Sequence, residues 1–140
     1  MDYTAECRVG RLVEARLLGL RSIEAVTQFW EALSQAFAVA GPNAVICADW
    51  RAAHVMAPEI AAEMINLLSR GNAHLERSGV LLAPGHATFS LQVERVMRVA
   101  NNPSRRTFRD PFEMERFLAE VLGPAERERV RAFLHDVARP

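Results

Sequence analysis

Residues 44–48, Ala-Val-Ile-Cys-Ala, form one of two short apolar runs that decide the fold, and residues 79–83, Gly-Val-Leu-Leu-Ala, form the other. Each run lies between two stretches whose apolar residues recur with the period of a helix. Strands with so few polar side chains are buried on both faces, as in a parallel sheet covered by helices. The two runs therefore predict an α/β fold.

The start of the chain predicts a β-hairpin ahead of these strands. Residues 3–9 alternate between apolar and polar side chains, which is typical of a strand with one buried face. Gly10 and Arg11 then form a two-residue turn into a second strand over 12–18, because glycine readily adopts positive φ. A short edge strand over 105–109 completes a five-stranded mixed sheet: an N-terminal hairpin followed by alternating strands and helices.

Capping and breaking residues predict where the helices begin and end. Ser22 is suited to cap the first helix, and Pro58 suits the first helical position of the second. The third helix ends before Pro103, since proline cannot continue a helix. A capping box opens a fourth helix over 110–122, and an amphipathic fifth helix follows over 125–137.

The fifth helix is an addition to the α/β unit. We expect the α/β domain to cover residues 1–123 and the helix to belong to residues 124–140, with Val130, Phe133 and Leu134 on its apolar face. Such a helix packs either on its own domain or on a second copy of the chain, so a homodimer is an alternative.

Charge and composition exclude some classes of protein. The chain of 140 residues has 17 basic and 17 acidic side chains, so no net charge attracts it to nucleic acid or to a membrane surface. All the basic residues are arginine, which excludes Schiff-base and P-loop lysine chemistry.

Cys7 and Cys47 both fall in predicted strands and are expected to be free thiols. With neither a basic nor an apolar leader and no long apolar segment, we expect a cytoplasmic protein.

The order of these elements resembles a known family. A strand that ends at Asp49 precedes a helix opening at Pro58, and a strand over 79–84 follows; a strand over 105–110 leads into the Phe-Glu-Met-Glu-Arg-Phe-Leu of 112–118. Together with the hairpin, this pattern resembles a STAS domain, and in particular the SpoIIAA-like proteins named for an anti-sigma-factor antagonist. The resemblance covers residues 3–122 and consists of topology and apolar pattern.

The resemblance implies a regulatory, non-enzymatic module that binds another protein near the start of the helix after the third strand. Phosphorylated members carry a serine or threonine there. Residues 51–64 contain no serine, threonine or tyrosine, so that switch cannot act at the matching position. Glu59 either resembles a permanent negative charge or is a carboxylate favoured by the helix dipole.

The predicted contact site for a protein partner follows the third strand. It consists of Trp50, His54, Val55, Met56 and Glu59. We expect Val55 and Met56 to be exposed in the loop, because exposed apolar side chains of this kind anchor many protein interfaces.

Polar side chains at the same edge of the sheet suggest catalysis or metal binding as an alternative function. Asp49, His54 and His86 follow neighbouring strands, and an acid with two histidines is able to bind a metal or transfer protons. Their spacing matches no metal or catalytic motif, and the other reading is that Asp49 binds loop amides while the histidines are exposed. We therefore predict no catalytic residue, metal or cofactor.

A group of arginines supports a second function. Arg95, Arg98, Arg105, Arg106 and Arg109 form either a solvated rim or a surface that binds phosphates or an acidic partner. The alternative to a protein-binding module is therefore a small-ligand or nucleotide-binding α/β domain. Its predicted anion-binding residues are His86, Thr88, Arg98 and Arg105.

Overall fold

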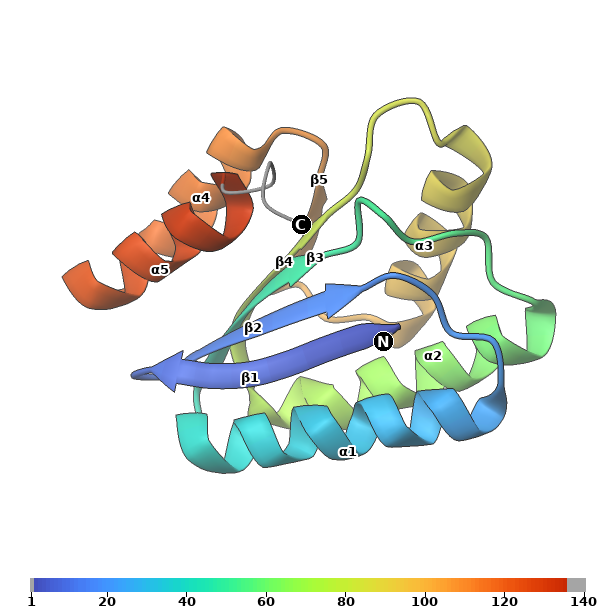
Figure 1. The fold of residues 1–140 in the computed structure, drawn as a ribbon, viewed down its shortest axis with the longest axis horizontal. Helices are drawn as coiled ribbons and strands as arrows, with labels where there is room; N and C mark the ends of the chain where they lie inside the picture. Colours follow the sequence, from blue (N-terminus) through green and yellow to red (C-terminus); the bar gives the residue numbers. More distant parts are fainter. Residues whose placement is uncertain (1, 136–140) are drawn as a thin grey trace.

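The computed structural model describes residues 2–135 and has the predicted α/β fold. Its five strands form one sheet in the order of the sequence: β1 (Tyr3–Val9), β2 (Leu12–Leu17), β3 (Ala44–Asp49), β4 (Leu75–Leu81) and β5 (Arg105–Phe108). The hairpin of β1 and β2 is antiparallel, and every later pair of neighbours is parallel (Figure 1).

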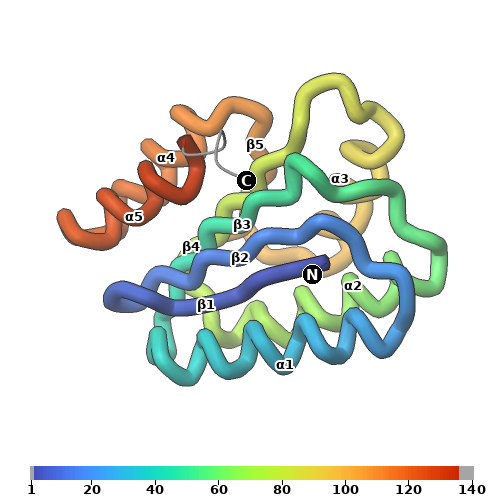
Figure 2. Tube along the Cα trace, in the orientation of Figure 1, coloured from blue at the N-terminus to red at the C-terminus, as the bar shows by residue number. Residues whose placement is uncertain are grey.

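Helices cover both faces of the sheet. They are α1 (Ile23–Ala40), α2 (Pro58–Gly71), the short 3-10 helix η1 (Asn72–His74), α3 (Ala87–Ala100), α4 (Pro111–Ala119) and α5 (Pro124–His135). Figures 1 and 2 show α1, α2 and α3 on one side of the sheet and α4 and α5 on the other. Because both faces are covered, β3 is buried along its whole length, which explains its apolar sequence.

Alternate residues of the strands divide between two apolar cores. Ala44, Ile46 and Ala48 face the core under α1, α2 and α3, whereas Val45 and Cys47 face the core under α4 and α5. Burial and the negative charges of Glu14 and Asp49 raise the pKa of Cys47 well above its ordinary value. Both cysteines are free thiols, and Cys47 is an inert packing residue.

The local signals for turns and caps are confirmed. Gly10 has a φ of 56° in the hairpin turn. The Ser22 hydroxyl accepts a hydrogen bond from the Ala25 amide at 3.1 Å, and the Asp110 carboxylate accepts one from the Phe112 amide at 2.9 Å. These caps satisfy amides that have no partner within the helix.

Two element boundaries differ from the prediction by three residues or more. β4 begins at Leu75, not near Gly79, because its polar first half has partners that are distant in the chain: Arg77 pairs with Glu120 and lies over the Phe117 ring. α4 ends at Ala119, before Leu122, which a tight turn directs into the core beneath α4 and α5. The fifth helix begins at Pro124, and its predicted last residue, Val137, lies outside the described residues. Within residues 2–135, no helix combines the length and the apolar character that crossing a membrane requires.

Candidate functional site

The loop between β3 and α2 does not expose all the side chains that were predicted to contact a partner. Trp50 is 3% exposed and Met56 is 5% exposed, and both pack in the core with Ile60 and Phe89. The prediction that Met56 is an exposed anchor is therefore wrong. The Trp50 amide donates to the Leu81 carbonyl at 2.9 Å, and this bond holds the residue against the end of β4.

Met56 is also held through its backbone. Gln92 of α3 accepts a hydrogen bond from the Met56 amide at 2.8 Å and donates one to the Met56 carbonyl at 2.7 Å. The two bonds satisfy both backbone polar groups of a residue whose side chain is buried. Sequence periodicity could not reveal this pairing, because Gln92 is 36 residues away in the chain.

The remaining three predicted contact residues are exposed. They are His54, Val55 and Glu59, and the Val55 side chain is 56% exposed. His54 and Val55 line an open hollow of about 260 Å³ that His86 and Thr88 line from the loop before α3. The structure thus brings these four residues together, as expected of two loops at the carboxyl edge of parallel strands. Neither Glu59 nor Asp49 lines this hollow.

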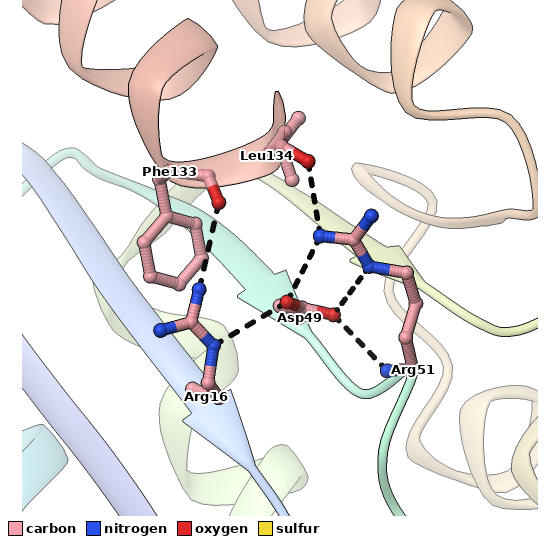
Figure 3. Close-up of polar contacts among 5 residues, drawn as sticks. All are labelled: Arg16, Asp49, Arg51, Phe133 and Leu134. Atoms are coloured by element: carbon pink, nitrogen blue, oxygen red, sulfur yellow. Dashed lines mark hydrogen bonds and ion pairs between the residues drawn. The ribbon is translucent and has the colours of Figure 1, made fainter. Parts of the chain in front are cut away.

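Asp49 lies in a separate cluster of charges at the end of β3 (Figure 3). Its Oδ1 atom accepts hydrogen bonds from the Arg51 amide at 3.0 Å and from Arg51 Nε at 2.9 Å, and its Oδ2 atom accepts from Arg51 Nη2 at 3.0 Å and Arg16 Nε at 3.4 Å. Burial raises the pKa of Asp49, but the hydrogen bonds and charge of Arg51, and then the charge of Arg16, outweigh burial and hold the pKa below its ordinary value. An ionised carboxylate held by two arginines is a structural anchor, and its bond to the Arg51 amide agrees with the loop-amide interpretation.

The same two arginines hold the end of α5. Arg51 Nη2 donates to the Leu134 carbonyl at 3.0 Å, and Arg16 Nη2 donates to the Phe133 carbonyl at 3.5 Å (Figure 3). The Arg16 guanidinium also lies 4.4 Å from the centre of the Phe133 ring. Carbonyls near the carboxyl end of a helix carry partial negative charge, so the two cations stabilise the last described turn of α5.

Further contacts hold the rest of α5 on its own sheet. Arg129 Nε and Nη2 donate to Glu14 of β2 at 3.0 and 2.5 Å. At the start of the helix, Glu126 accepts hydrogen bonds from the Gly123 amide at 2.8 Å and from the Arg11 amide at 2.9 Å. Val130 and Leu134 are buried between these polar contacts. Packing of this helix on its own domain is one of the two predicted arrangements, but the sequence analysis did not identify the ion pair between Arg129 and Glu14. The signal for it is a glutamate and an arginine within the otherwise apolar β2.

The predicted anion-binding residues do not form one site. His86 and Thr88 lie at the start of α3, whereas Arg98 and Arg105 line a second hollow at the end of that helix. The prediction of a single site is therefore wrong, because Arg105 lies at the amino end of β5, whereas His86 follows the carboxyl end of β4. The arginine group is also divided: Arg109 pairs with Glu94 at 3.2 Å.

No group of three histidine, cysteine, aspartate or glutamate side chains within the described part of the chain is placed to hold a metal ion.

Comparisons of the chain with protein-family models, with curated proteins and with solved structures find no match.

Proposed function

We propose that this protein is a regulatory module that binds another protein, as SpoIIAA-like STAS domains do. Its proposed contact surface is centred on Val55. One observation carries the proposal: the Val55 side chain is 56% exposed, although the next residue, Met56, is buried. An exposed apolar side chain gains burial when a partner covers it. Val55 is therefore the anchor of the proposed surface.

The loop that carries Val55 is fixed before any partner binds. Trp50 and Met56 pack in the core, and the two hydrogen bonds from Gln92 hold the Met56 backbone on α3. Ordering a mobile loop on association costs conformational entropy, and a loop that is already held avoids that cost. Trp50 and Met56 thus position the contact surface and do not touch the partner.

Polar side chains surround the apolar anchor. His54, His86 and Thr88 line the same hollow as Val55, and Glu59 is exposed in the first turn of α2. An apolar centre with a polar rim is the usual arrangement of a protein interface. Since residues 51–64 have no side-chain hydroxyl group to phosphorylate, Glu59 provides a charge that does not change with phosphorylation of this segment.

Affinity capture with matched variants tests the proposal. The tagged full chain is incubated with lysate of its source, and bound proteins are identified by mass spectrometry. Val55→Asp should lose a partner that the unmodified protein retains, because it places a charge in the apolar centre. Val39→Asp is the control: Val39 is 69% exposed near the carboxyl end of α1, and this end of the helix lies across the molecule from the loop between β3 and α2 (Figure 1).

Thermal unfolding of the same variants separates lost contact from lost folding. Both substitutions affect exposed side chains, so each should change the free energy of unfolding by only about 0.5 kcal/mol. A Val55→Asp protein that keeps every partner, or a Val39→Asp protein that loses the same ones, contradicts the proposed surface. Failure of the unmodified protein to retain any specific partner contradicts the proposed function.

A further inference from the structure

The hollow at the end of α3 has a buried arginine in its wall. It has a volume of about 470 Å³ and lies between the last turn of α3 and the start of β5. Arg105 is 9% exposed, whereas Arg98 and Arg106, which also line the hollow, are exposed. Arg105 is therefore fixed in the protein, Arg98 is free to move, and the Arg106 guanidinium lies 4.9 Å from the centre of the Phe117 ring.

A set of neutral side chains and carbonyls holds Arg105 in place. Its Nη1 donates to Asn72 Oδ1 at 2.9 Å, and its Nη2 donates to the Leu68 carbonyl at 3.4 Å. Asn72 is held in turn, because its Oδ1 accepts from Asn102 Nδ2 at 3.2 Å and its Nδ2 donates to the Ala100 carbonyl at 2.8 Å. The guanidinium is thus pre-positioned between the ends of α2 and α3.

These neutral acceptors leave the charge of Arg105 without a counter-ion. Among residues 2–135, no carboxylate forms an ion pair with it. Glu94 lines the hollow, but its carboxylate accepts from Arg109. Burial lowers the pKa of Arg105 to about 10, so the side chain is still charged at neutral pH.

An unpaired buried cation is costly, and an external anion would reduce that cost. The carbonyl ends of α2 and α3 offset part of the positive charge. Arg98 adds a second full charge, so the hollow remains suited to an anion. A guanidinium presents five N–H donors in a fork that fits an oxyanion, and the two hydrogen bonds above use two of those of Arg105.

We propose that this hollow binds the phosphate group of a small ligand, with Arg105 as the fixed donor and Arg98 as the mobile one. A phosphate, which carries up to two negative charges, matches two arginines better than a carboxylate does. The site lies at the opposite end of α3 from the Val55 surface and does not depend on it.

Thermal unfolding of the full chain in inorganic phosphate tests the site, with sodium chloride and sodium acetate at equal ionic strength as the other two arms. A ligand that binds the folded state raises the unfolding midpoint as its concentration increases, whereas ionic screening is the same in all three salts. Phosphate should raise the midpoint more than either control salt. Backbone amide signals of residues 101, 102 and 104–106 should shift in the phosphate titration.

Variants assign the effect to the two arginines. Arg98→Gln and Arg105→Met should each weaken the apparent affinity for phosphate at least tenfold. Arg21→Gln should leave it unchanged, because Arg21 is an exposed arginine in the loop before α1, at the other edge of the sheet. If Arg105→Met does not fold, Arg98→Gln decides the outcome, since its side chain is exposed.

Each of four results would overturn the proposal. The first is that phosphate raises the unfolding midpoint no more than chloride does, and the second is that acetate raises it as much as phosphate. The third is that Arg98→Gln keeps the full affinity for phosphate, and the fourth is that the amide shifts lie outside the segment of residues 101–106. A phosphate effect that is lost in Arg98→Gln and kept in Arg21→Gln supports it.

Discussion

Glu14 of β2 and Arg129 of α5 are 115 residues apart in the chain and form an ion pair with two hydrogen bonds on the sheet face that α5 covers. The Glu14 side chain is 2% exposed, whereas that of Arg129 is 30% exposed. A buried carboxylate requires a partner, since the cost of removing an isolated charge from water is several kcal/mol. The pair therefore determines where α5 can lie on the sheet.

Removing Arg129 should destabilise the protein strongly. Arg129→Met leaves Glu14 buried without its cation, and we expect a loss of about 3 kcal/mol in the free energy of unfolding. Urea unfolding followed by circular dichroism measures the loss. The double variant Glu14→Leu with Arg129→Met should recover most of it, because no buried charge then remains. A single variant as stable as the unmodified protein would show that α5 does not depend on this pair.

Gly10→Ala should destabilise the attachment of α5 to the hairpin. Gly10 has a φ of 56°, and a Cβ atom there would lie 2.2 Å from Glu126 Oε2, the atom that accepts from the Arg11 amide. The strained backbone and the displaced carboxylate should together lower the free energy of unfolding by about 1 to 2 kcal/mol. Gly19→Ala is the control, because a Cβ atom at Gly19 meets no atom within 4 Å. Equal stability of the two variants would contradict the role of this close contact.

The cluster around Asp49 should make stability depend on pH under acidic conditions. The pKa of Asp49 is lower in the folded protein than its ordinary value of 3.8, so the unfolded chain binds the proton more readily. The contribution of Asp49 is therefore complete above the unfolded pKa and is lost as the pH falls through the folded pKa. Unfolding free energies between pH 7 and pH 2.5 should fall more steeply below about pH 4 in the unmodified protein than in Asp49→Asn. Identical slopes would show that Asp49 is not coupled to Arg51 and Arg16 in solution.

Local signals in the sequence predicted most of the element boundaries. The turn at Gly10 and the caps at Ser22 and Asp110 depend on residues within a few positions of each other, and the structure confirms all three. The apolar runs of β3 and β4 are also local signals, and they predicted two strands that are buried on both faces. The start of β4 was missed because its polar residues are accommodated by α4, a partner that is distant in the sequence.

The candidate sites were less predictable than the fold. Met56 follows an exposed valine in a loop, and only the packing of Ile60 and Phe89 and the hydrogen bonds of Gln92 show that it is buried. Arg98 and Arg105 line one hollow, whereas His86 and Thr88, which the sequence analysis assigns to the same site, line another. The two pairs lie at opposite ends of α3. Their separation follows from the topology of the fold and cannot be read from the types of the residues.

The amino-acid sequence alone determined the class of the fold, the hairpin, the order of strands and helices and most of their ends, because apolar periodicity and capping act over a few residues. Only the tertiary structure decided where α5 lies, which loop residues are exposed and which arginines share a hollow. These features depend on pairings such as Glu14 with Arg129 and Asp49 with Arg51 and Arg16. A buried charge is stabilised by an opposite charge that lies close to it in space, and the two charges come close only when the sheet and its helices have packed.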